Sequence, residues 1–168
     1  MLKMKAEEFF YSITTRLIIL VFSMLELVHF TIKDLGLIVP NIIVMSIFFW
    51  GIYRDDKVFS VKYLLFVSIL NEILKGELIG LETIPNLVFF YFISNKRRFF
   101  INKPFFVIWV GFMIFSASLF LVKIVLLSLI HKHFFFEEYL LMQLILSIVL
   151  YTLMHWIYSH LRLTPSRS

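Results

Sequence analysis

The chain has no cysteine among its 168 residues, which excludes disulfide bonds and thiolate-based metal or redox sites. Charge is also scarce, because charged residues make up 16% of the chain; an average soluble domain has about 25%. Hydrophobic residues make up 61%, and a water-soluble fold of this length could not bury so much apolar surface. We therefore expect lipid to be the surrounding solvent.

Familiar catalytic patterns are also absent from the sequence. It has no Ser-His-Asp order, no phosphate-binding loop, no His-Glu-x-x-His and no paired intramembrane aspartates. A membrane enzyme would need two facing polar residues, and only Glu72 with Lys123 could be proposed. We expect a protein that is not an enzyme and that holds no cofactor or metal.

Six apolar segments approach the ~20 residues that a transmembrane helix needs. They span about residues 16–32, 35–53, 58–74, 81–97, 104–130 and 138–161. No soluble domain, long linker or low-complexity tail separates them. The sequence predicts an all-α integral membrane protein, with residues 1–168 forming a single six-helix transmembrane domain.

The basic residues predict the orientation of these spans. With the N-terminus inside, 12 of the 16 Lys and Arg fall at cytoplasmic positions, and only Lys33, Lys75 and Lys132 fall outside. This asymmetry follows the positive-inside rule, so the net charge of +5 reflects topology rather than nucleic-acid binding. We expect a multi-pass protein with cytoplasmic N- and C-termini, whose first span is retained because no small-residue cleavage site follows it.

The stretch "LNEILKGELIG" places charges and glycines close together in this apolar chain. Glu72, Gly76 and Gly80 are spaced four apart, so on a helix they would form one narrow stripe. Gly-x-x-x-Gly permits close approach of two helices, which indicates a packing corner between spans three and four or a contact for a partner helix. The alternative is a plain turn whose charges are solvated at the membrane surface.

Other polar or aromatic residues have ordinary explanations. Pro40-Asn41 begins or kinks the second span, because proline is tolerated at a first helical position. Trp50, at the other end, fits an interfacial aromatic belt. Lys123 lies within the fifth span and could form an intramembrane ion pair or snorkel outward. Its candidate partners are Glu26, Glu72 and Glu138.

The region "VPNIIVMSIFFWGIYRDDKVFSVKYLLFVSILNEILKGELIGLETI" resembles the central part of the bacterial rod shape-determining protein MreD family. In that family Pro-Asn or Pro-Asp opens the second span, an aromatic residue ends it, and an Asp-x-x-x-Gly-x-x-x-Gly corner closes the third. Pro40, Asn41, Trp50, Glu72, Gly76 and Gly80 occupy those places here. This chain departs from the pattern at Val39, where the family commonly has Arg, and at Glu72, where it usually has Asp.

The resemblance implies a non-enzymatic scaffold of the cell-elongation complex in the bacterial inner membrane. Its implied partners are an MreC-like membrane protein, MreB filaments, the RodA glycosyltransferase and a penicillin-binding transpeptidase, all serving sidewall peptidoglycan synthesis. The family's fold is similar to the S subunits of energy-coupling-factor transporters. The alternative is therefore a small-molecule-binding S subunit, with a site drawn from Glu26, His29, Asn71, Glu72 and Lys123.

Overall fold

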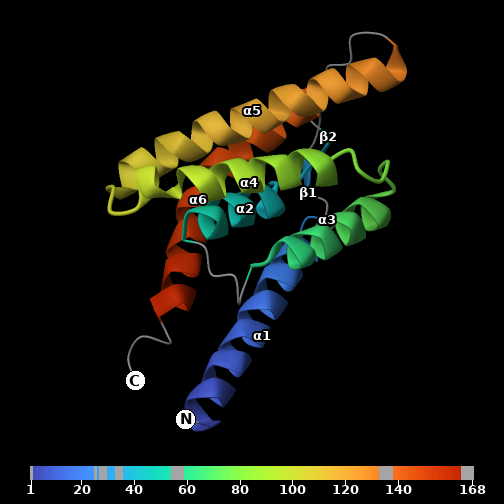
Figure 1. Cartoon of the computed structure of the whole chain (residues 1–168). Coiled ribbons are helices and arrows are strands. Elements are labelled where there is room, and N and C mark those ends of the chain that lie inside the picture. The colour runs from blue at the N-terminus through green and yellow to red at the C-terminus, as the bar shows by residue number, and fades with distance from the viewer. Residues whose placement is uncertain are drawn as a thin grey trace.

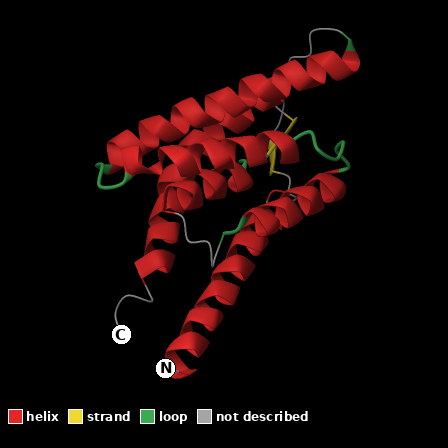
Figure 2. Ribbon diagram, in the orientation of Figure 1, coloured by secondary structure: helices red, strands yellow, loops and turns green. Residues whose placement is uncertain are grey.

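The computed structural model describes residues 2–24, 26, 30–32, 36–53, 59–132 and 138–163. Within them the chain forms six helices and one short hairpin (Figures 1 and 2). The helices are α1 (Leu2–Met24), α2 (Ile42–Tyr53), α3 (Val61–Lys75), α4 (Thr83–Phe100), α5 (Phe105–His131) and α6 (Glu138–Leu163), and the strands are β1 (Phe30–Ile32) and β2 (Gly36–Ile38). The predicted all-α class is confirmed for the helices, and the hairpin is the exception to it.

The hairpin corrects the first two predicted segments. Segment 16–32 was expected to be one helix, but α1 ends at Met24 and residues 30–32 pair antiparallel with 36–38. Segment 35–53 loses its first residues to the same pairing, so α2 has only 12 residues. Hydropathy missed this because an apolar run has the same composition whether it forms a helix or a short strand.

The last four helices begin and end within three residues of the predicted segments. By length and composition, α5 and the Glu138–Leu161 part of α6 are able to cross a membrane, whereas Phe10–Met24 and Ile42–Tyr53 are shorter apolar helices. Six crossings therefore remain a prediction for the chain as a whole.

Helix α2 lies at the centre of the bundle, between α4, α5 and α6 on one side and α1 on the other (Figure 1). Every residue from Ile42 to Ile52 is buried, as expected for a helix that is hydrophobic all round. Aromatic rings fill the space around it, and the Phe112 and Tyr151 rings stack with centroids 4.0 Å apart. The hydroxyls of Ser46 and Tyr158 share a buried hydrogen bond of 2.6 Å.

Trp50 belongs to this core. Its side chain is completely buried and its ring lies 5.2 Å from that of Phe49 and 6.0 Å from that of Tyr158. The expectation that Trp50 forms part of an interfacial belt is wrong, because α2 is enclosed by other helices and its ring faces protein on all sides.

Candidate functional site

The turn between α3 and α4 differs from the predicted helical stripe. Helix α3 ends at Lys75, and Gly76 follows in the left-handed conformation with φ 69°. Gly80 also has a positive φ, 99°, so both glycines shape the turn rather than a helix surface. The Glu77 N–H donates to the Glu72 carbonyl and the Gly76 N–H to the Ile73 carbonyl, which is a Schellman ending. The corner was predicted from the spacing, but the stripe was wrong.

The Glu72 side chain caps the N-terminus of the next helix, α4. It is completely buried, and its carboxylate accepts hydrogen bonds from the N–H groups of Gly80 (2.9 Å), Glu82 (2.6 Å) and Thr83 (2.8 Å). The Thr83 hydroxyl donates a fourth bond of 2.7 Å. A negative charge at a helix N-terminus is stabilised by the helix dipole and by the free N–H groups there. The alternative of a solvated Glu72 is therefore excluded.

The Glu26 carboxylate likewise accepts a hydrogen bond from a backbone N–H at the start of α2. Its Oε1 accepts from the Ile43 N–H at 2.8 Å, and its Oε2 accepts from the Asn71 amide at 2.6 Å and from the Lys75 ammonium at 2.8 Å. The carboxylate therefore connects the segment after α1 to the start of α2 and the end of α3. Backbone N–H groups need such partners wherever water is excluded.

Asn41 completes the start of α2. Its side-chain oxygen accepts from the Val44 N–H at 3.0 Å, the usual bond of an N-cap residue, and its own N–H donates to the Ser147 hydroxyl on α6 at 2.8 Å. Pro40 precedes it and has no N–H to satisfy. The Pro-Asn pair thus starts α2 and connects it to α6.

Two lysines and three glutamates form a chain of ion pairs across this corner. The Lys75 ammonium lies 2.8 Å from Glu26 and 3.5 Å from Glu82. Lys123 donates a short hydrogen bond to Glu82 and lies 3.6 Å from Glu77. The predicted pair of Lys123 with Glu26 is wrong. Glu26 forms its ion pair with Lys75, and the α3–α4 turn places Glu82 next to Lys123.

The series of ion pairs contains three glutamates but only two lysines, so it has one more negative than positive side chain. Burial and the neighbouring Glu82 carboxylate raise the pKa of Glu77, and the ammonium groups of Lys123 and Lys75 offset this only in part. One oxygen of Glu77 is buried without a hydrogen-bond partner. A proton on Glu77 would balance the charges of the five side chains.

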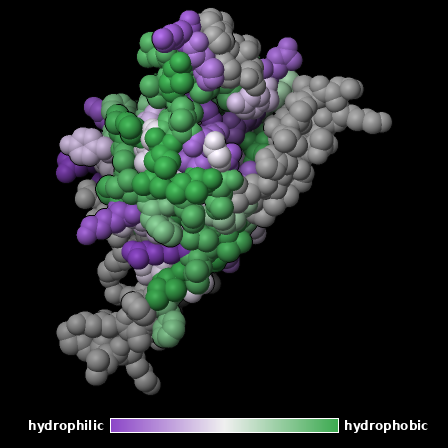
Figure 3. Space-filling model, turned by 90° about the vertical axis from the view of Figure 1, so that its right-hand side faces the viewer, coloured by the Kyte–Doolittle hydropathy of each residue, from purple (hydrophilic) through white to green (hydrophobic). Residues whose placement is uncertain are grey.

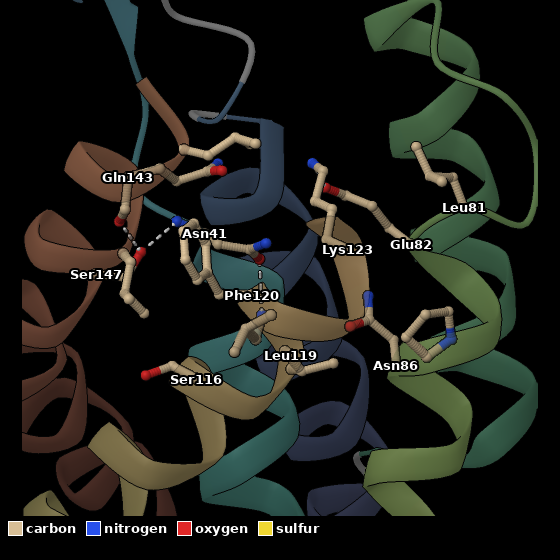
Figure 4. Close-up of a pocket in the computed structure, with 14 residues that line it drawn as sticks. Asn41, Leu81, Glu82, Asn86, Ser116, Leu119, Phe120, Lys123, Gln143 and Ser147 are labelled. Carbon is tan, nitrogen blue, oxygen red and sulfur yellow. Dashed lines mark hydrogen bonds and ion pairs between the residues drawn. The ribbon is translucent and has the colours of Figure 1, made fainter. Parts of the chain in front are cut away.

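A small chamber, lined by both polar and apolar side chains, lies beside the ion pairs (Figure 4). It has a volume of about 60 Å³, which is room for a few water molecules. The Asn41, Asn86 and Gln143 side chains line it from α2, α4 and α6, with Glu82 and Lys123 beside them (Figure 4). Figure 3 shows hydrophilic side chains, in purple, gathered within a largely apolar face of the molecule.

Sequence reasoning found Glu72, Asn41, Glu26 and Lys123 but missed Glu82 as the partner of Lys123. Glu82 was assigned to the start of an apolar span, although a carboxylate there is costly unless it is paired. That cost was the signal that could have identified it. Of the residues considered for a transporter site, Glu26 and Asn71 bond to each other, whereas His29 lies outside the described residues.

The fold and the corner define a bundle of apolar helices, two of them able to cross a membrane, with buried polar groups gathered around a rigid turn. The chain belongs to the family of the rod shape-determining protein MreD, whose family model matches residues 7–162. The resemblance seen in the sequence is therefore confirmed, and membership indicates a role in determining rod shape. No curated protein and no solved structure matches the chain.

Proposed function

We propose that this chain is a non-enzymatic scaffold of the cell-elongation complex in the bacterial inner membrane. It crosses the membrane six times with both termini in the cytoplasm, and it binds an MreC-like membrane protein. Through that partner it serves MreB filaments, the RodA glycosyltransferase and a penicillin-binding transpeptidase during sidewall peptidoglycan synthesis. Family membership and the apolar helices support this proposal.

The observation that supports partner binding most directly is the tip of the α3–α4 turn. Leu78 and Ile79 are 60% and 67% exposed there, although a turn at an aqueous surface normally carries polar residues. The backbone on both sides of them is fixed by the Schellman ending and by the Glu72 carboxylate. Rigid, exposed apolar side chains make effective interface anchors, because little conformational entropy is lost on binding.

The test replaces both anchors. We expect the L78N/I79N variant to lose co-purification with the MreC-like partner and to produce rounded cells, while its membrane level stays normal. Leu129→Asn is the matched control, because Leu129 is 70% exposed near the end of α5 and lies outside the turn. Retained co-purification and rod shape in the double variant would contradict this contact.

The chamber beside the ion pairs is too small to be the ligand site of a vitamin-binding S subunit. Sites for small organic ligands typically measure about 300–1,000 Å³, whereas the chamber measures about 60 Å³. Its polar groups also bond largely to the protein itself, as Asn41 and Glu82 do.

A further inference from the structure

An apolar groove lies between α4 and α5, at the opposite end of these helices from the polar corner. Its volume is about 560 Å³, and its walls include Phe92, Phe99, Phe106 and Ile114. These four side chains are 54–68% exposed. The groove is therefore a large apolar surface that the described part of the chain leaves uncovered.

The inner wall of the groove is set by close packing at Gly111. A Cβ at this position would lie 2.4 Å from a ring carbon of Phe100, so the ring rests directly on the glycine backbone. Phe100 also packs against the core residue Phe48, with ring centroids 5.6 Å apart. Close packing of helices and core rings therefore forms the inner wall of the groove.

One cation lines the groove, and three more follow it closely in the sequence. Lys96 lines it, and Arg97, Arg98 and Lys103 follow in the last turn of α4 and the connection to α5. Within the described part of the chain, none of these four side chains forms an ion pair, whereas Lys75 and Lys123 each have two carboxylate partners. A ligand for this site should therefore combine an apolar body with an anionic end.

We propose that the groove binds an anionic phospholipid, with one acyl chain between α4 and α5 and the phosphate at Lys96. An α-helix about 10 Å across would fill this volume in little more than one turn of about 5.4 Å, whereas a narrow acyl chain can follow the groove along its length. Basic pockets between transmembrane helices on the cytoplasmic side are typical sites for anionic headgroups. The inference rests on the proposed membrane topology, which places these cations at the cytoplasmic surface.

The test uses the purified full-length chain. Native mass spectrometry would measure binding of phosphatidylglycerol and of phosphatidylcholine with identical acyl chains. We expect tighter binding of phosphatidylglycerol, and we expect Lys96→Gln to weaken it about fivefold without affecting phosphatidylcholine. Lys62→Gln removes the same charge from an exposed lysine on α3, away from the groove, and should change neither.

A second pair of variants tests the groove itself. Ile114→Trp should fill it and weaken the binding of both lipids, whereas Leu121→Trp, at an equally exposed position of α5 outside the groove, should not. Equal affinity for the two lipids, or equal effects of Lys96→Gln and Lys62→Gln, would overturn the proposal. So would an Ile114→Trp variant that loses its protein partner but retains phosphatidylglycerol, because the groove would then hold a helix.

The lipid assay needs no partner protein, so its failure is distinct from failure of the scaffold. Lost lipid preference with intact co-purification would overturn only the lipid site. Intact lipid preference with normal partner binding by the L78N/I79N variant would overturn only the proposed contact at the turn.

Discussion

The Glu72 carboxylate is part of α3 but satisfies the backbone of α4. Its two oxygens accept four hydrogen bonds from the turn and the start of α4. Pro85 has no N–H, so few backbone N–H groups in the first turn of α4 lack an acceptor. The family usually has Asp at this place. Here the longer side chain reaches donors 8 to 11 residues further along the chain.

Gly76 gives a prediction for a single residue. Its φ of 69° disfavours residues with a Cβ, although no atom lies within 4 Å of the place where a Cβ would be. Gly76→Leu should therefore lower the free energy of unfolding by about 1–2 kcal/mol through backbone strain alone. Thermal unfolding in detergent measures this change.

Gly76→Asn is the control for backbone strain, because asparagine tolerates the left-handed conformation better than other residues. It should retain most of the stability and of the partner binding. Equal losses in the Leu and Asn variants would mean that Gly76 is required for space around the turn rather than for its conformation.

Single residues also show where sequence reasoning failed. The spacing of the charges along the chain did not identify the partner of Lys123, because the turn that carries Glu82 to it depends on the left-handed conformations of Gly76 and Gly80. Only the cost of an unpaired carboxylate in an apolar segment pointed to Glu82. Trp50 was misassigned for a related reason. Its position at the end of an apolar segment indicates depth along the chain, whereas its burial depends on which helices surround α2.

At the scale of helices, two starts depend on a carboxylate from elsewhere in the chain. Glu72 serves α4, and Glu26 serves α2 together with the N-cap Asn41. The start of α2 could be predicted from Pro40-Asn41, because that signal is local. The contribution of Glu26 could not, because it comes from 17 residues away.

Removal of the Glu72 carboxylate should destabilise the protein more than removal of an exposed glutamate. Glu72→Ala leaves two buried N–H groups, one partly buried N–H group and one buried hydroxyl without their acceptor, at a cost of about 3 kcal/mol or more. Glu138→Ala is the matched control, because Glu138 also lies at a helix start but is exposed, and its loss should cost less than about 1 kcal/mol. Denaturant unfolding in mixed micelles compares the two variants, and equal effects would show that the four bonds to Glu72 contribute little.

At the scale of the whole molecule, the ion pairs and the basic residues of α4 lie at opposite ends of the bundle. The α3–α4 turn and the ion pairs lie at one end of α4, and Lys96, Arg97 and Arg98 lie at its other end. The starts of α1 and α3 and the ends of α2, α4 and α6 share the end with the cations, as alternating helix directions require (Figure 1). This arrangement supports the predicted topology, in which the cations face the cytoplasm.

The absence of cysteine allows a direct test of that topology. A membrane-impermeant maleimide should label Lys132→Cys in cells with a permeable outer layer and an intact inner membrane. It should label Arg98→Cys only after the inner membrane is opened. The wild-type chain provides a background without reactive thiols. Labelling of Arg98→Cys from the outside would overturn both the orientation and the lipid site.

The family and the helical class could be predicted at this scale, because both depend on hydropathy and short motifs. The hairpin and the shortness of α2 could not. They depend on the pairing of β1 with β2 and on helices that replace lipid around α2.

The enclosure of α2 has a consequence for biogenesis. A helix of 12 residues is about 18 Å long, whereas the hydrocarbon layer is about 30 Å thick. In the proposed six-span topology, the apolar sides of α2 contact lipid tails during insertion and are covered by the other helices afterwards. We therefore expect the other helices to enclose α2 late in maturation, and we expect a nascent chain that stops before α6 to leave this central helix partly open to the bilayer.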